Sequence, residues 1–289
     1  MKIGVVGTPS GWSSERLADT VARTTGYRLL INMKEIRLDL GQKACWFEGT
    51  NLMSLDALIV KKVGARYSSA LLNRLELLRV MNEHGLPVFS KPSSMIAVLN
   101  RLSCTATLQQ ANIPMPPTTL TENIDEALEA IKQYGTAVLK PLYSSKGRGM
   151  VIVSDTKDAH KTVREYASVF PMMYIQKAID LKEDKDLGVV FIQGKYLTTY
   201  ARCKGNSWNT TTTSGGYYEK YTPSIEIIEL ARKAQHPFKL DFTCVDVAIT
   251  SEGPVVFEVS AFGGFKGILQ AQGIDAAQLY VDAVMKELS

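Results

Sequence analysis

The chain has 289 residues, 45% of them hydrophobic, and its 33 basic and 29 acidic side chains give a net charge of +4. This length is sufficient for two or three packed units with their own hydrophobic cores. The charge is too small to predict nucleic-acid binding, and phosphate-bearing small substrates explain it equally well. No apolar stretch approaches the roughly 20 residues of a membrane span, and the opening MKIGVVG is typical of a strand rather than a signal peptide. We therefore expect neither nucleic acid nor a membrane as a partner.

The four cysteines lie far apart in the sequence and form no CxxC pair: Cys45, Cys104, Cys203 and Cys244. Scattered cysteines of this kind predict a reduced, cytoplasmic protein. The three histidines are scattered as well, which argues against a zinc site or a histidine-based triad.

Residues 1–90 predict an α/β unit, because short apolar runs alternate with longer amphipathic segments. We expect strands at 2–6, 28–32, 35–40, 43–47 and 56–60, and helices from a Ser13-Ser14-Glu15 cap to Thr25 and over 68–84. Ligands of such units bind beyond the carboxyl ends of the strands, so Lys61, Lys62 and Arg66 mark a candidate crevice. A solvated basic loop is the alternative. The loop at 7–11 lacks the G-x-G-x-x-G spacing of dinucleotide sites.

A second unit is expected over 91–180, with two short helices (93–99 and 102–111) and a proline-rich link before its sheet. The strand at 136–142 carries Lys140, and a lysine in an apolar strand is costly to bury without a partner. The loop that follows is small and basic, and its free N–H groups could cover anionic oxygens. We expect this flap to include Ser145, Lys146, Gly147 and Arg148. The rest of the unit is a helix at 125–134, a strand at 150–153, a helix at 157–170 and a strand at 172–176.

The third unit, over 181–289, follows a charged loop at 180–186 that we expect to be exposed. It has a hairpin at 187–192 and 196–202, a polar loop SWNTTTTSGG at 207–216, and helices at 223–235 and 276–288.

Two carboxylates stand out in the apolar hairpin formed by strands at 243–249 and 254–260. The pairing would bring Asp246 and Glu258 onto one face of the sheet. Two carboxylates in a dry environment need a positive partner, and a divalent cation is the usual one. The alternative is a buried hairpin with one salt-bridged acid.

Taken in order, these motifs resemble the RimK-type ATP-grasp ligases from about residue 56 to residue 283. The resemblance is found in NRLSCTATLQQANIPMPPT, VLKPLYSSKGRGM, IQKAIDLKEDKDLGVVFIQGKY, SWNTTTTSGG and CVDVAITSEGPVVFEVSAFGGFKGI. The ATP-grasp enzyme of the so-called GAK gene system is similar around SWNTTTTSGG and FEVSAFGGF. The resemblance implies an ATP-grasp fold of two α+β subdomains behind an N-terminal Rossmann-like domain.

The resemblance also implies an ADP-forming reaction, in which a carboxylate becomes an acyl phosphate and an amine then attacks it. The substrates would be ATP, a small-molecule or peptide carboxylate, and an amine or amino acid; the cofactor would be magnesium, with manganese as a substitute. Arg202 would stabilise the oxyanion, and Asp246, Glu258 and Ser260 would bind the metal. The remaining implied nucleotide contacts are Arg101, Lys140, the flap, Gln176, Lys177, Ala178, Asp186, Asn209, Thr210 and Thr211.

Several positions depart from the family pattern. The family's metal-binding asparagine is Ser260 here, and its arginine two residues after Asp186 is Gly188. Losing that guanidinium, a bidentate carboxylate clamp, argues against assuming glutamate as the substrate. The family's glutamate at the hinge is Lys177 here, and its lysine in the small flanking helix is Arg101. Its Arg-Ser-Asn sequence in the polar loop is Asn-Thr-Thr at 209–211. Two alternatives stay open, an ATP-grasp kinase and a catalytically impaired ATP-binding protein, as does the number of subunits in an assembly.

Overall fold

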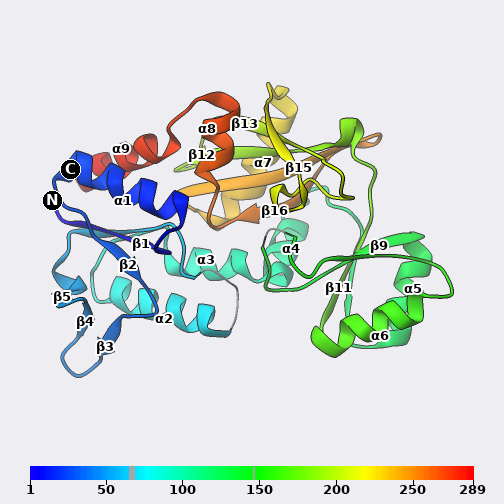
Figure 1. Cartoon of the computed structure of the whole chain (residues 1–289), viewed down its shortest axis with the longest axis horizontal. Helices are drawn as coiled ribbons and strands as arrows, with labels where there is room; N and C mark the ends of the chain where they lie inside the picture. Colours follow the sequence, from blue (N-terminus) through cyan, green and yellow to red (C-terminus); the bar gives the residue numbers. More distant parts are fainter. Residues whose placement is uncertain (65–68, 146) are drawn as a thin grey trace.

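A computed structural model describes residues 1–64, 69–145 and 147–289 of the chain (Figure 1). Its N-terminal sheet is parallel, in the order β2-β1-β6-β7: β1 Ile3–Gly7, β2 Leu30–Asn32, β6 Ala57–Val60 and β7 Val88–Phe89. Helix α1 (Trp12–Thr25) covers the face that carries Val5, and α2 (Ser69–Glu83) covers the face that carries Val6. A small antiparallel sheet extends from this unit: β3 Arg37–Asp39, β4 Ala44–Phe47 and β5 Thr50–Asn51.

The expected start of α1 is wrong. The helix begins at Trp12 after Gly11, which provides no side-chain cap. Ser14 lies inside the helix, where its hydroxyl accepts a hydrogen bond from the Thr8 N–H at 3.1 Å. The serine thus fastens the loop after β1 rather than capping the helix.

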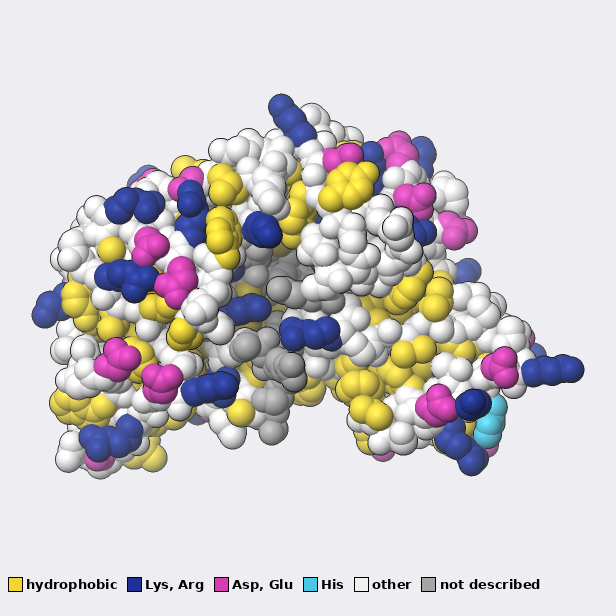
Figure 2. Space-filling view, viewed as in Figure 1, with side chains coloured by type: hydrophobic (Ala, Val, Ile, Leu, Met, Phe, Trp, Pro, Cys, Tyr) yellow, Lys and Arg dark blue, Asp and Glu magenta, His cyan; other side chains and the backbone are white. Residues whose placement is uncertain are grey.

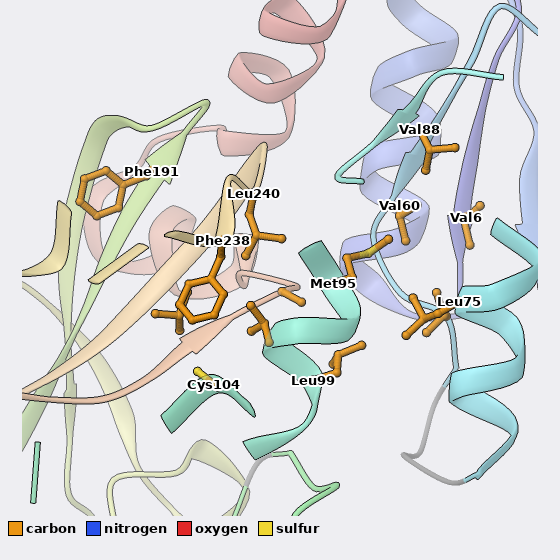
Figure 3. Packing of buried hydrophobic residues seen from close by; sticks show 14 of the residues in the cluster. Val6, Val60, Leu75, Val88, Met95, Leu99, Cys104, Phe191, Phe238 and Leu240 are labelled. Carbon is orange, nitrogen blue, oxygen red and sulfur yellow. The ribbon is translucent and has the colours of Figure 1, made fainter. Parts of the chain in front are cut away.

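Helices α3 (Pro92–Leu99) and α4 (Arg101–Gln110) join the N-terminal sheet to the C-terminal one. In Figure 3, Met95 and Leu99 of α3 lie between side chains of the N-terminal unit, such as Val60, and those near β15, such as Phe238. The described residues of these two units therefore share one continuous apolar core.

The central sheet is antiparallel and has its own core (Figure 1). Its order is β10-β9-β11-β8: β8 Thr118–Thr121, β9 Thr136–Lys140, β10 Val151–Ser154 and β11 Met173–Lys177. Helices α5 (Ile124–Tyr134) and α6 (Ala159–Val169) pack against it. The expected division at 90 and 180 stays a prediction, although residues 92–113 pack with the large core and not with this one.

The C-terminal sheet is antiparallel, in the order β14-β13-β12-β15-β16: β12 Lys185–Ile192, β13 Lys195–Cys203, β14 Tyr217–Lys220, β15 Phe242–Thr250 and β16 Gly253–Ser260. Helix α7 (Ile225–Gln235) packs on one face, while α8 (Phe265–Gln272) and α9 (Ala276–Leu288) pack on the other. Helix α9 also lies beside α1, so the two ends of the chain are close together (Figure 1). None of the helices in the described part of the chain is long and apolar enough to cross a membrane.

One expectation fails in this unit. The charged segment at 180–186 is not an exposed loop throughout, because β12 begins at Lys185 and Asp186 is 3% exposed. The Asp186 carboxylate forms an ion pair with Arg202 of β13, and the sequence pattern of a single segment does not reveal such a partner.

Candidate active site

The hairpin of β15 and β16 places two carboxylates side by side, as the sequence predicted. Asp246 is the register partner of Glu258, and a bulge follows immediately at Asp246/Val247. Directly opposed residues point to the same face of an antiparallel pair. This face is the one on which α8 and α9 pack further along the strands.

Arg202 connects this pair to the neighbouring strands. Its guanidinium forms a forked ion pair with Asp186, in which Nε donates to Oδ1 at 3.2 Å and Nη2 contacts Oδ2. The same Nη2 lies 2.9 Å from Oδ2 of Asp246. Burial would lower the pKa of Arg202, but the two carboxylates outweigh it and raise that pKa well above its usual value. Arg202 is therefore a fixed positive charge at the carboxylate pair.

Burial raises the pKa of Asp246, and the nearby Glu258 adds to that shift, while Arg202 lowers it. Glu258 has a different balance: burial would raise its pKa, but Arg101 and Lys140 hold it below the usual value. Arg101 Nη1 lies 2.7 Å from Glu258 Oε2, and its Nε donates to the Pro141 carbonyl at 3.2 Å. Arg101 thus connects α4 and the end of β9 to the hairpin of β15 and β16.

Lys140 lies on β9 and is 8% exposed, as expected of a lysine in an apolar strand. Its Nζ donates to Gln176 Oε1 at 2.5 Å and lies 5.1 Å from the centre of the Phe257 ring. Its pKa is lowered to about 7, because burial and the nearby Arg101 outweigh three carboxylates that raise it: Glu258, Asp246 and Asp186. Two sheets thus contribute to one charged cluster.

The flap and the polar loop meet each other. A Cβ placed on Gly147 would lie 3.0 Å from Thr211 Cγ2, so the two segments touch. Arg148 bonds within the flap, with Nη2 donating to Ser145 Oγ at 2.9 Å. The Thr211 hydroxyl donates to Asn209 Oδ1 at 2.6 Å, and Thr210 beside them is buried. Lys146, like Arg66, lies outside the described residues.

The hinge residues are the last residue of β11, Lys177, and the one after it, Ala178, and their N–H groups have partners inside the protein. Lys177 donates to the Pro117 carbonyl at 2.8 Å and Ala178 to the Thr136 carbonyl at 2.9 Å. Because both N–H groups are already used, a backbone hydrogen bond from these two residues to a nucleotide would involve a carbonyl oxygen. Asp186, expected on the nucleoside side, forms an ion pair with Arg202.

Sequence reasoning did not name Tyr200, which borders the carboxylate pair. Gly188 lies between Tyr200 and Asp246 in one row of the sheet. A Cβ on Gly188 would lie 2.4 Å from the Tyr200 ring, so the tyrosine fills the space of a side chain at position 188. The Tyr200 hydroxyl lies 3.6 Å from Cys244 Sγ, which lies 3.8 Å from Asp246 Oδ1. The pairing of positions 188 and 200 depends on the bulge between Val190 and Phe191, which a pattern within one strand does not show.

The donor set fits a magnesium ion shared with a nucleotide. Within the described residues, no group of three or more His, Cys, Asp and Glu side chains is arranged to hold a metal. Magnesium, however, is typically bound by one or two carboxylates together with substrate phosphates. Asp246 and Glu258 supply those two, each already paired with a cation, and Ser260 follows on the same strand. Figure 2 shows a hollow at the middle of this view of the molecule, with Lys and Arg side chains around it.

A family model for the RimK-like ATP-grasp domain matches residues 98–284. The chain belongs to this family. The resemblance found in the motifs is thereby confirmed, and the chain is an ATP-dependent ligase that joins a carboxylate to an amine.

Two relatives illustrate the match. The tetrahydromethanopterin:alpha-L-glutamate ligase of Methanosarcina acetivorans is 25% identical over 317 residues, which cover 97% of this chain and 98% of the relative. A probable alpha-L-glutamate ligase of Shewanella halifaxensis is 24% identical and covers 100% of this chain but 64% of its own length.

Solved structures share the fold. The ATP-grasp ligase PsnB, complexed with a phosphomimetic variant of its minimal precursor, Mg and ADP, has a TM-score of 0.78 at 16% identity, covering 99% of this chain and 98% of PsnB. D-alanyl-alanine synthetase A from Vibrio cholerae has a TM-score of 0.75 at 15% identity, with 100% and 98% covered. The expected ATP-grasp fold is confirmed.

Proposed function

We propose that this ligase transfers the γ-phosphoryl group of ATP to a substrate carboxylate and then joins the acyl group to an amine. A carboxylate oxygen attacks the γ-phosphorus, the bond to ADP breaks, and an acyl phosphate forms. The amine nitrogen then attacks the acyl carbon, phosphate leaves, and the amine loses a proton. The observation that carries the proposal is the cluster of Arg202, Asp246 and Glu258 within electrostatic reach of Lys140, because it places fixed cations and metal-binding carboxylates at one point.

Lys140 is proposed to bind ATP phosphate from its strand. The amide oxygen of Gln176 holds its ammonium group, and a phosphate oxygen would supply the negative charge that a buried lysine lacks. The flap with Ser145, Gly147 and Arg148 would cover the phosphates, joined by the contacting loop at 209–211. Lys146 is proposed for the same role from sequence alone.

The adenine would be held at the hinge through the carbonyl oxygens of Lys177 and Ala178, because their N–H groups donate elsewhere. Asp186 is proposed to position Arg202 rather than to meet the nucleoside directly. Arg101 would compensate Glu258 when the site holds no metal and contact phosphate when it does.

Asp246 and Glu258, with Ser260 beside them, are proposed to hold magnesium, which would neutralise charge on the phosphates during transfer. Arg202 is proposed to stabilise the oxyanion at the acyl carbon. Its bidentate bond to Asp186 fixes the guanidinium plane before the reaction, so little reorganisation is needed at the transition state.

The carboxylate substrate is proposed to be a small molecule or a peptide, and the amine an amino acid or related amine. Glutamate, named in the relatives above, is not carried over, because position 188 has no guanidinium and the Tyr200 ring fills its place. A glutamate-specific clamp is absent from that position. The protein is proposed to be cytoplasmic, and manganese is proposed to substitute for magnesium.

Trapping of the acyl phosphate tests the proposal. The protein is mixed with ATP, magnesium, a panel of carboxylic acids and hydroxylamine, and both ADP and hydroxamate are measured. A ligase releases ADP and forms the hydroxamate of its acid substrate in equal amounts. A kinase acting on a hydroxyl would release ADP and give a product heavier by one phosphate, with no hydroxamate. An impaired ATP-binding protein would bind Mg·ATP and release no ADP with any acid.

A further inference from the structure

A cavity of ≈ 440 Å³ lies at the end of the C-terminal sheet that is remote from the candidate active site. Its volume is within the usual range for small-ligand sites. Four segments line it, namely the turn after β12, the end of α7, the residues before β15 and the last turn of α9; they include Gln193, Gly194, Gln235, His236, Asp241 and Glu287. Gln193 follows β12 seven positions after Asp186, which corresponds to about 23 Å along an extended strand. We call it the distal cavity.

Gln235 is the side chain that most directly indicates a ligand in the distal cavity. It lies on the buried face of α7, together with Ala231 and Ala234, and is 3% exposed. Its side-chain amide forms no hydrogen bond with any other residue in the described part of the chain. The amide nitrogen lies 3.8 Å from the position of a Cβ built on Gly194, which also lines the cavity, so the amide is directed toward it. A buried amide without a partner is destabilising, and a ligand that bonds to Gln235 would remove that cost.

Two carboxylates line the same cavity. Asp241 is half-buried, and its carboxylate has no hydrogen bond or ion pair with another residue that the structure describes. Its pKa is raised to about 6, because burial and the nearby Glu287 outweigh the opposite effect of Lys91. Glu287 is exposed, and its Oε2 accepts a hydrogen bond from Gln193 Nε2 at 2.5 Å. A positive group placed between Asp241 and Glu287 would therefore stabilise both carboxylates.

The lining favours an organic cation over a metal ion. Its described residues include two carboxylates and one lysine, Lys239. No group of three or more His, Cys, Asp and Glu side chains in the described ranges is arranged to hold a metal, and His236 is thus not placed to complete such a site. A primary ammonium group has three donors and requires no fixed coordination geometry, so it can bond to Asp241 and Glu287 together. A second polar group on the same molecule would reach the Gln235 amide.

We propose that the distal cavity binds a short aliphatic amine, with its ammonium group at Asp241 and Glu287 and its second polar group at Gln235. The described lining of this site includes none of the residues assigned to the ligase chemistry, and the inference does not depend on the proposed function. The amine would bind at the far ends of β12 and β15, the strands that carry Asp186 and Asp246 at the carboxylate pair.

Titration with three molecules of equal chain length tests the inference. Diaminobutane has an ammonium group at each end, aminobutanol has one ammonium group and one hydroxyl, and butanediol has only hydroxyls. The chain has three histidines, so the ring proton signals of His236 report on the cavity in the full-length protein, and those of His84 are a control in the same spectrum. Ionic strength is matched with sodium chloride, and the pH is held at about 8, above the pKa of Asp241.

We expect both amines to shift the His236 signals saturably, with dissociation constants of about 0.1 to 10 mM, which is ordinary for molecules of this size. Butanediol should bind about 10- to 100-fold more weakly than diaminobutane, the range for a charged hydrogen bond.

Three variants locate the binding. Glu287→Gln changes an exposed residue and should fold normally; it and Asp241→Asn should each weaken both amines by about 10-fold or more. Gln235→Met keeps the length of the side chain without its amide and should weaken aminobutanol by about 2- to 10-fold. Asp282→Asn removes the same charge from the exposed surface of α9 and should change the amine affinities by less than about twofold.

Three results would overturn the inference. In the first, neither amine shifts the His236 signals more than those of His84, and the cavity then holds only water. In the second, butanediol binds as tightly as the amines. In the third, Asp282→Asn weakens the amines as much as Glu287→Gln does, so that the attraction is a general effect of surface charge. Mg·ADP binding and hydroxamate formation are measured on the same wild-type protein, and their loss would contradict the proposed ligase function rather than this site.

Discussion

Two lysines in different regions of the molecule are both buried and both have a lowered pKa, but the charged side chains around them differ. Lys140 is 8% exposed and Lys61 is 5% exposed, and burial lowers the pKa of each to about 7. Lys140 lies on the central sheet and faces the carboxylates of the C-terminal sheet. Lys61 follows β6, an inner strand of the N-terminal sheet, and lies beside a second lysine and a backbone carbonyl.

The two lysines differ in the charges of the side chains that surround them. Around Lys140 there are both carboxylates and arginines, so the proposed metal ion and phosphate group would enter a site whose charges already balance in part. Around Lys61, the neighbouring Lys62 lowers the pKa further, and no carboxylate within residues 1–64, 69–145 and 147–289 forms an ion pair with Lys61. Both lysines are costly to bury, and the charged side chains beside them differ. The following predictions test this comparison.

The largest effect is expected from Glu258→Gln, which removes charge from the metal site and leaves Arg101 without its partner. We expect turnover to fall by roughly 1000-fold or more, because a metal supplies several kcal/mol of charge stabilisation. Hydroxamate formation measures the loss, and Glu252→Gln at the exposed turn of the same hairpin is the matched control. Near-normal turnover in Glu258→Gln would show that this hairpin is only part of the core.

Arg202→Ala should lower turnover by roughly 100- to 1000-fold, the range for removing one oxyanion donor. Substrate affinity should change less, because the charge that Arg202 meets develops mainly during the reaction. Since the variant leaves the buried Asp186 unpaired, thermal unfolding must accompany the kinetics. Arg202→Lys keeps the charge and should lose less. If affinity falls and turnover stays, Arg202 anchors a substrate instead.

Lys140→Met and Lys61→Met should have reciprocal effects. The first variant should weaken Mg·ATP binding by about 10- to 100-fold, as expected for one charged hydrogen bond to phosphate. The second should leave Mg·ATP binding within about twofold of the wild type. Calorimetry with a non-hydrolysable ATP analogue measures both. Equal losses in the two variants would mean that the two lysines serve one ligand, and the comparison would fail.

The pH dependence of stability should report both lysines. Each has a folded-state pKa of about 7 and an ordinary value of 10.5, so the unfolded chain binds more protons between these values. The free energy of unfolding should therefore rise with pH from about 7 to about 10.5, by at most ~1.4 kcal/mol per pH unit for each lysine. Denaturant unfolding across this range should show a shallower rise in each Met variant. An unchanged slope in both variants would contradict the lowered pKa values.

The smallest effect is expected from Ser260→Asn. A serine hydroxyl is a neutral ligand, weaker than an amide carbonyl, and magnesium readily keeps a water molecule instead. The variant should lower the magnesium concentration for half-maximal turnover several-fold without changing the product. Activity is measured against both magnesium and manganese in the wild type and the variant. Superimposable curves would remove Ser260 from the metal site.

Local patterns were sufficient to predict much of this molecule. The paired carboxylates of β15 and β16 follow from alternation in a single hairpin, and the buried position of Lys140 follows from its apolar strand. The strands β8 and β14 were missed, because their residues are intermediate or exposed and show no clear alternation. Such edge strands depend on a neighbour for their hydrogen bonds, so the sequence of the strand itself contains little of the signal.

The partners of the charged residues were decided by the tertiary structure. Arg101 and Glu258 are 157 residues apart, and Lys61 and Gly263 are 202 residues apart, so no spacing rule connects them. Asp186 was expected in an exposed loop and is instead buried against Arg202. A sequence shows which side chains are costly to bury, because that depends on residue type and its apolar neighbours. Which opposite charge makes the burial tolerable depends on how the sheets pack. Here the packing places Lys140 near carboxylates, whereas Lys61 has no ion pair within the described part of the chain.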